Sequence, residues 1–329
     1  MKLMTGLLSV MIFSASAKMP GFDIYVGDVE LQDNRLKVSH LKALTKRSEY
    51  DNQPLFMPDG DSLLYTAALL YTSALTSKKD GQEDGQKDGQ KDGQKKVQKE
   101  VQMAEQTDSI FVSLKTGQVS NLTNSIENEY SPTLMPAGKG FSVIRAADNK
   151  QKLWRYPLNP EKQFSEPASE LLTNINPVGY HAWVDSNRVM LFVLGEPNTL
   201  QLVDIQTQTS QVLDENIGPS LFAIPRSSLM SYTASIGKGE DIQWQLRSYH
   251  PETGQIERLT TLPSGAYYYA WAGNGYAIAA VDSILMQWDK TNTDKGWQTF
   301  ADVSDVCPKG VTRLATNSNN SKIALVCSL

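Results

Sequence analysis

The residues best suited to bind a ligand lie at the start of a short sequence that occurs in two similar copies. We call this sequence the repeat phrase. Residues 50–60 read "YDNQPLFMPDG", and residues 128–138 read "NEYSPTLMPAG". The first copy offers the carboxylate of Asp51 beside the amide of Asn52, and the second offers Glu129 beside Tyr130. Carboxylate and amide oxygens can hold a hard cation, and polar groups that converge with aromatic rings can bind a small ligand.

Weaker copies of the phrase carry other polar groups at the same place. One copy opens with Tyr180 and His181, another with the run Tyr267–Tyr269, and the last with Thr312 and Arg313. The candidate site is made up of Asp51, Asn52, Glu129, Tyr130, Tyr180, His181, Tyr268 and Arg313. We predict no catalytic residue among them, because the chain lacks a G-x-S-x-G elbow, a P-loop and any close pair of His or Cys.

The repeat phrase also predicts the secondary structure in which these residues lie. Aligning Pro54 on Pro132 also brings Gly60 onto Gly138, and each copy has a short apolar run, a turn and a β-rich run. Proline fixes φ on one side of such a turn, and glycine supplies a positive φ on the other. In the last copy Asn320 takes the glycine position, since Asn tolerates the left-handed backbone. Each copy therefore predicts a β-hairpin.

Six such hairpins, spaced about forty to fifty residues apart, predict a six-bladed β-propeller with four strands per blade. The sixth hairpin runs into the C-terminus without outer strands, while residues 23–45 read as two strands without an inner hairpin. We therefore expect the N-terminal pair to complete the last blade and close the ring. Two smaller β domains are the alternative. In a propeller the innermost strands begin at one mouth of the central channel, so the candidate residues should meet there.

"PLFMPDGDSLLYTA", residues 54–67, resembles the repeat of the TolB-type propellers, a degenerate relative of the WD40 repeat. The resemblance covers most of residues 23–327. It implies a six-bladed propeller and a binding role in the cell envelope. We expect no counterpart of the N-terminal α/β domain of TolB in these residues.

Residues 1–17 have the parts of a secretory signal peptide. Lys2 is the positive residue, Leu3–Phe13 is the apolar stretch, and Ala15-Ser16-Ala17 is the small-residue cleavage site. An N-terminal core helix is the alternative. We expect residues 18–329 to form the exported propeller, in the periplasm or secreted, without a membrane span and as a monomer. In an oxidising compartment Cys307 and Cys327 could form a disulfide, and two buried thiols are the alternative.

A low-complexity insert at about 78–107 interrupts the first blade. "KKDGQEDGQKDGQKDGQKK", residues 78–96, repeats Asp-Gly-Gln with a charge and has no apolar group to bury, which predicts disorder. The following "KVQKEVQMAEQ" could form a short helix with Val97, Val101 and Ala104 on one face.

Composition limits the partners. The net charge of −5 disfavours sequence-blind contact with phosphates, so we expect no nucleic acid partner. We expect a non-enzymatic binding or scaffold propeller that takes an envelope or extracellular protein, or a small ligand, and needs no cofactor. The alternatives are a metal-assisted hydrolase or lactonase, with an ion such as Ca²⁺ held by Asp51, Asn52 and Glu129, or a sugar- or peptide-processing role. The channel could also be polar only because water fills it.

Overall fold

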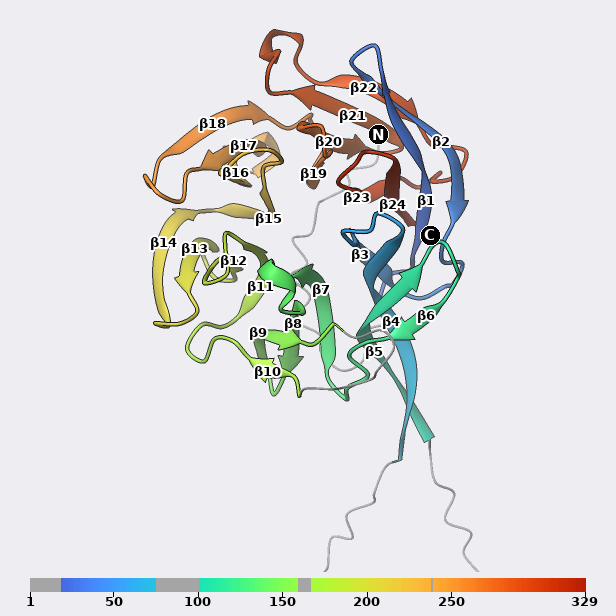
Figure 1. Ribbon diagram of the computed structural model, residues 1–329, viewed down its shortest axis with the longest axis vertical. Helices are drawn as coiled ribbons and strands as arrows, with labels where there is room; N and C mark the ends of the chain where they lie inside the picture. The colour runs from blue at the N-terminus through green and yellow to red at the C-terminus, as the bar shows by residue number, and fades with distance from the viewer. Residues whose placement is uncertain (1–18, 75–100, 159–166, 238) are drawn as a thin grey trace, which may run out of the picture.

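A computed structural model of the protein describes residues 19–74, 101–158, 167–237 and 239–329. Within these residues, 24 strands form six antiparallel sheets of four strands each, arranged around a common axis (Figure 1). The predicted six-bladed β-propeller is therefore confirmed. The predicted signal peptide and the low-complexity residues 78–96 lie outside the described residues.

Each repeat phrase forms the two inner strands of a blade. The innermost strands, which surround the ring axis in Figure 1, are β3 (Asp51–Phe56), β7 (Asn128–Leu134), β11 (Val178–Trp183), β15 (Ile217–Ala223), β19 (Tyr269–Trp271) and β23 (Val311–Thr316). Their hairpin partners are β4 (Ser62–Ala74), β8 (Phe141–Ala147), β12 (Arg188–Val193), β16 (Met230–Ile236), β20 (Tyr276–Val281) and β24 (Lys322–Ser328).

The outer strands follow in the same order around the ring. The third strands are β5 (Val101–Ser113), β9 (Lys150–Tyr156), β13 (Thr199–Asp204), β17 (Gln243–Tyr249), β21 (Ile284–Asp289) and β1 (Phe22–Gln32). The outermost strands are β6 (Val119–Asn121), β10 (Ser169–Glu170), β14 (Thr209–Glu215), β18 (Ile256–Thr261), β22 (Gln298–Asp302) and β2 (Arg35–Ala43).

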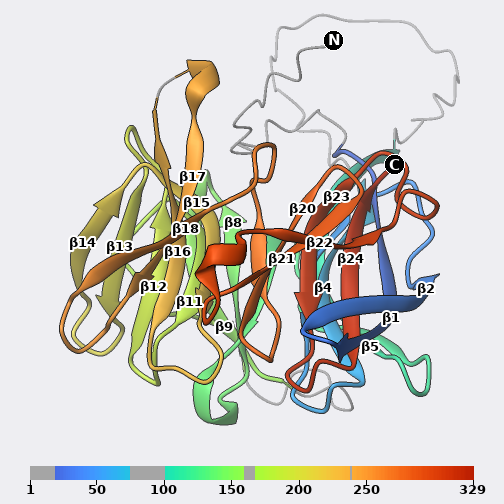
Figure 2. The same ribbon diagram turned by 90° about the horizontal axis from the view of Figure 1, so that it is seen from above.

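The two ends of the chain close the ring as predicted. The last blade has the order β2-β1-β24-β23, so the N-terminal hairpin supplies its outer half. β1 pairs with β24 from Phe22 opposite Ser328 to Asp28 opposite Lys322, and Figure 2 shows the two strands side by side. The backbone N–H of Leu329 then donates to the carbonyl of Gly21 at 3.2 Å.

The turn chemistry of the hairpins also matches the sequence. Gly60 and Asn320 have positive φ angles of 73° and 56°, and each donates its N–H to the residue three positions earlier, Met57 or Asn317. Asp59 stabilises the first turn by accepting the N–H groups of residues 61 and 62 at 3.0 Å each. These local contacts explain why a short phrase was enough to predict the hairpins.

Apolar and polar contacts together join neighbouring blades. Trp183 and Trp271, at corresponding positions in two repeats, are both buried in cores between blades. The indole Nε1–H of Trp183 donates to the hydroxyl of Ser142 on β8 at 2.9 Å, and that of Trp271 donates to Ser231 on β16 at 2.8 Å. Each tryptophan is thus hydrogen-bonded to the second strand of the preceding blade.

The segment after the low-complexity repeat differs from the prediction. Val101–Ser113 form strand β5, which pairs with β4 over its whole length, from Ala74 opposite Val101 to Ser62 opposite Ser113. The helix predicted to include Val101 and Ala104 is therefore wrong in this part. Its pattern was too short to separate helix from strand, and pairing with β4 decides the outcome.

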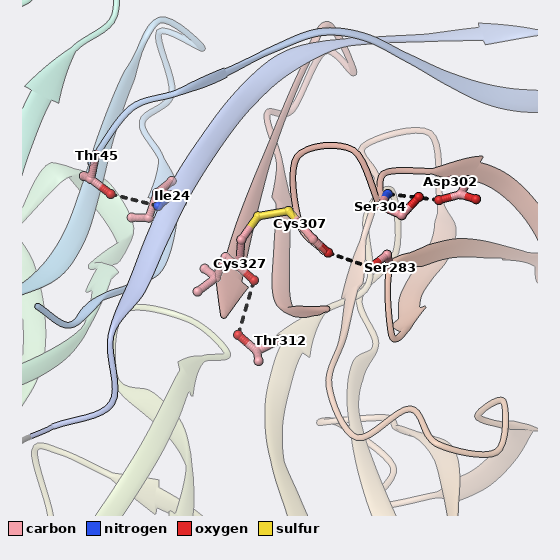
Figure 3. The surroundings of a disulfide bond; sticks show 9 residues. Ile24, Thr45, Ser283, Asp302, Ser304, Cys307, Thr312 and Cys327 are labelled. Carbon is pink, nitrogen blue, oxygen red and sulfur yellow. Dashed lines mark hydrogen bonds between the residues drawn. A yellow bond between two sulfur atoms is a disulfide. The ribbon is translucent and has the colours of Figure 1, made fainter. Parts of the chain in front are cut away.

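A disulfide joins Cys307 to Cys327 within the closing blade (Figure 3). Their Cα atoms are 5.1 Å apart, and both residues are buried in the core that the closing blade shares with its neighbour. The carbonyl of Cys307 also accepts a hydrogen bond from Ser283 at 2.6 Å. The disulfide therefore joins the loop before β23 to the end of β24.

In the part of the chain that the structure describes, no helix is long and apolar enough to cross a membrane.

Replacing Leu36 should weaken ring closure. Leu36 is fully buried and packs in the core between the closing blade and its neighbour, whereas its cross-strand partner Leu31 is 45% exposed. Leu36→Ala should lower the free energy of unfolding by about 2–5 kcal/mol, because it leaves a cavity. Urea denaturation would measure the loss. Leu31→Ala is the matched control and should stay within about 0.5 kcal/mol of the parent. Equal effects of the two changes would contradict this account.

Removing the disulfide should lower the stability of the fold, because the unfolded chain gains conformational freedom without this cross-link. The bond closes a loop with a sequence separation of 20 residues. Replacing both Cys307 and Cys327 by Ala should therefore lower the free energy of unfolding by about 3 kcal/mol. Thiol titration of the denatured and unreduced protein, produced under oxidising conditions, should find no free thiol. Two titratable thiols would show that the bond does not form.

Candidate binding site at the channel mouth

Five of the six innermost strands have a shift in pairing register near their start. The pairing register shifts between Asn52 and Leu55 in β3, and between Tyr130 and Thr133 in β7. Similar shifts occur in β11, β15 and β23. Gln53 and Ser131, which align in the repeat, both have positive φ angles, of 56° and 58°. A β-bulge turns the following side chain away from its regular direction, so these shifts decide which side chains face the channel.

Arg313 and five tyrosines that lie near it or near one another form what we call the mouth cluster: Tyr50, Tyr130, Tyr180, Tyr267, Tyr268 and Arg313. The guanidinium carbon of Arg313 lies 3.9 Å from the ring centre of Tyr268 and 5.1 Å from that of Tyr180. Its Nη2 donates a hydrogen bond to the hydroxyl of Tyr180 at 2.7 Å. Because these residues belong to five different blades, only the closed ring can assemble them.

The other tyrosines complete the cluster through packing and electrostatics. The rings of Tyr267 and Tyr268 are 4.8 Å apart in an edge-to-face arrangement. Burial raises the pKa of Tyr267 to about 12, with a further rise from the neighbouring Tyr180. Burial also raises the pKa of Tyr130 well above its ordinary value, with added contributions from Tyr180 and Tyr50. The raised pKa values of Tyr50, Tyr130, Tyr267 and Tyr268 keep these phenols neutral at pH 7. The cluster therefore offers hydroxyl groups and ring faces.

Asp51 and Asn52 do not reach this cluster as free ligands. Asp51 is fully buried, and both its oxygens accept hydrogen bonds from Arg47. Burial is the largest influence on the pKa of Asp51 and raises it, in spite of that pairing. The side-chain oxygen of Asn52 accepts the N–H of Gln53 at 2.7 Å. These two residues stabilise the entry to the first blade.

Glu129 likewise makes its contacts inside its own blade and is not a free ligand. Its side chain is fully buried, and Oε1 accepts hydrogen bonds from Ser125 at 2.5 Å and from the hydroxyl of Tyr156 at 2.8 Å. The Nε of Arg145 lies 3.5 Å from the same oxygen. Burial raises the pKa of Glu129 to about 7, because desolvation outweighs the stabilisation by these partners. Its Oε2 has no hydrogen-bond partner among the described residues.

His181 belongs to the contacts between blades. Its Nε2 lies 2.6 Å from the hydroxyl of Ser142, which also accepts the indole N–H of Trp183. Two blades further on, Tyr269 and Trp271 contact Ser231 in the same way, so His181 occupies the place of Tyr269. Burial lowers the pKa of His181 to about 3, which keeps the ring neutral.

The structure thus divides the eight predicted residues into two groups. Tyr130, Tyr180, Tyr268 and Arg313 meet in the mouth cluster. Of the other four, Asp51, Asn52 and Glu129 make contacts within their own blades, and His181 contacts the preceding blade. Sequence reasoning did not select Tyr50, which directly precedes Asp51 and could have been found by testing both neighbours of each acidic residue. In the described part of the chain, no group of three or more His, Cys, Asp or Glu side chains is placed to hold a metal ion.

Comparison with solved structures places the fold among the six-bladed propellers of the TolB kind. A protein of Agrobacterium tumefaciens assigned as TolB superposes with a TM-score of 0.62 at 12% identity, over 95% of this chain and 99% of that one. TolB from Acinetobacter baumannii superposes with a TM-score of 0.52 at 11% identity, over 93% of this chain and 63% of that one. The TolB-like fold predicted from the repeat is therefore confirmed.

The same fold is also found in an enzyme. An oligogalacturonate lyase in complex with manganese superposes with a TM-score of 0.51 at 13% identity, over 90% of this chain and 83% of that one. No protein-family model and no curated protein matches the sequence. At such low identities the comparisons establish the fold, and the function has to be argued from the residues of this chain.

Replacing Glu129 should change how stability depends on pH. Because its pKa in the folded state is about 7, above the ordinary 4.5, the folded protein holds this proton more tightly than the unfolded chain. The contribution of Glu129 to stability is therefore fully present below pH 4.5 and is lost as pH rises to 7, by up to about 3 kcal/mol. Glu129→Gln stays neutral and should not show this loss.

Denaturation at pH 5 and pH 8 would measure the effect. The advantage of the parent over Glu129→Gln should shrink or reverse at pH 8. Glu127→Gln changes another carboxylate near Arg145, one whose side chain is 26% exposed, and is the matched control. Parallel pH profiles of the parent and Glu129→Gln would contradict this account.

Proposed function

We propose that this protein is an exported, non-enzymatic binding propeller that captures a segment of a partner protein, or a small ligand, at the mouth of its central channel. The mouth cluster is the observation that carries this proposal. Five tyrosines and one arginine from five blades gather at the place where the innermost strands begin. Convergent polar groups among aromatic rings are typical of ligand sites.

The side chains of the mouth cluster are suited to recognition. Tyr130, Tyr180, Tyr267, Tyr268 and Arg313 are partly exposed, so a ligand can reach them. Tyrosine and arginine contribute strongly to binding at protein interfaces, because they combine large apolar surfaces with hydrogen bonding. A ligand that covers them would bury both ring faces and hydroxyl groups.

The proposed location outside the cytoplasm rests on the leader at residues 1–17 and on the pair Cys307–Cys327. A disulfide is stable in the periplasm or outside the cell. The resemblance of the repeats to TolB-type propellers supports a place in the envelope. We propose that the protein acts there as a monomer, because its propeller closes within one chain.

The geometry gives less support to the metal-assisted hydrolase or lactonase. That reading needs Asp51 and Glu129 as ligands of a channel ion. Asp51 is paired with Arg47, while Glu129 accepts two hydrogen bonds within its own blade. A metal would have to displace these partners from carboxylates that are already buried.

Variants of the mouth cluster test the proposed function. The mature protein would first be used to capture partners from envelope extract, with and without a chelator. Tyr180→Ala and Tyr268→Ala should each weaken binding of the recovered partner by about tenfold or more, or at least ~1.4 kcal/mol, measured by isothermal titration. Lys115→Ala, an exposed change at the outer rim, is the control and should bind like the parent.

Thermal denaturation of each variant would confirm that the ring stays folded. If both tyrosine variants bind the partner as the parent does, the mouth is not the binding surface. If binding requires a metal that the chelator removes, the non-enzymatic reading loses its basis.

A further inference from the structure

Arg313 is half-buried and has no acidic partner among the described residues, unlike four other half-buried arginines. Arg47, Arg145, Arg188 and Arg247 each lie within ion-pair distance of at least one carboxylate. Within the described ranges, no Asp or Glu side chain comes within 4.0 Å of the guanidinium of Arg313. Its partners there are the aromatic rings of Tyr180 and Tyr268 and one phenol hydroxyl.

These partners leave the charge of Arg313 only partly compensated. A guanidinium remains charged at any pH that a protein meets, and a desolvated charge is costly unless it is paired. Cation–π contacts return less free energy than the removal of a charge from water costs. The mouth cluster therefore contains a positive charge that a negatively charged ligand would balance.

Arg313 also has hydrogen-bond donors to spare. A guanidinium has five N–H groups, and in the described structure Arg313 donates one hydrogen bond, from Nη2 to Tyr180. The planar fork formed by the remaining donors matches the two oxygens of a carboxylate. The flanking rings of Tyr180 and Tyr268 hold the guanidinium plane and provide surfaces on which the body of a ligand can lie.

The charge balance of the mouth favours a ligand with a single negative charge. Arg313 is the one cation whose charge lowers the pKa of Tyr50, Tyr267 and Tyr268 in the described structure. One cation balances one carboxylate, whereas a phosphate dianion would keep an excess negative charge. The net charge of −5 on the whole chain adds to this preference.

We propose that the ligand or partner segment is anchored by a monocarboxylate, held by the guanidinium of Arg313 between the rings of Tyr180 and Tyr268. This inference rests on the proposed function and names the chemical group that the mouth recognises. It predicts that Arg313 distinguishes ligands by their charge, whereas the tyrosines distinguish them by shape and by contact with the rings.

Three probes with the same ring test the inference: benzoate, the neutral benzamide and phenyl phosphate. Isothermal titration or NMR titration of the whole mature protein at pH 8 should show that benzoate binds at least tenfold more tightly than benzamide and more tightly than phenyl phosphate. Arg313→Gln should abolish the preference for benzoate over benzamide. Arg313→Lys keeps the charge without the fork, and it should retain only part of the preference.

Arg35→Gln, which removes an exposed arginine of β2, is the matched control and should behave like the parent. The inference is overturned if the parent binds benzoate no better than benzamide, if it binds no benzoate up to the solubility limit, or if Arg313→Gln keeps the preference. If phenyl phosphate binds more tightly than benzoate, the proposed preference for a monocarboxylate is wrong. If Tyr180→Ala loses the captured partner while Arg313→Gln keeps it, the proposed function stands and the carboxylate anchor fails.

Discussion

The pairing of β1 with β24 is the constraint on which the rest of the structure depends. A propeller blade buries its two faces only against two neighbours, so an open ring would leave one core exposed. The N-terminal hairpin meets this need by adding two strands to the last blade and by burying Leu36 against its neighbour. Closure also brings β23 beside β3, and it thereby places Arg313 in the same cluster as Tyr50.

Contacts between blades use many of the polar groups that look reactive in the sequence. Ser142 bonds His181 and Trp183, and Ser231 bonds Tyr269 and Trp271, so each serine hydroxyl joins two side chains of the next blade. Buried polar groups are costly when unpaired, and sharing one hydroxyl satisfies several of them. A histidine in this position is therefore part of the ring architecture.

The mouth cluster is what remains once the internal pairing is complete. Asp51 and Glu129 are held by arginines and hydroxyls inside their own blades, which leaves Arg313 among tyrosine rings and hydroxyl groups. A site with one partly compensated positive charge and several ring faces is suited to recognition more than to acid–base chemistry. The proposed binding role and the proposed carboxylate anchor follow from this division.

The sequence by itself determined the number of blades, their hairpins and the closure, because these depend on local turn chemistry and on a repeat with a regular period. It also predicted that Tyr130, Tyr180, Tyr268 and Arg313 would meet. It could not show that their sequence neighbours Glu129 and His181 point elsewhere, nor that Val101 lies in a strand. In a strand, a shift of one residue reverses the direction of every side chain, so the bulges and the pairing between distant segments decided these positions.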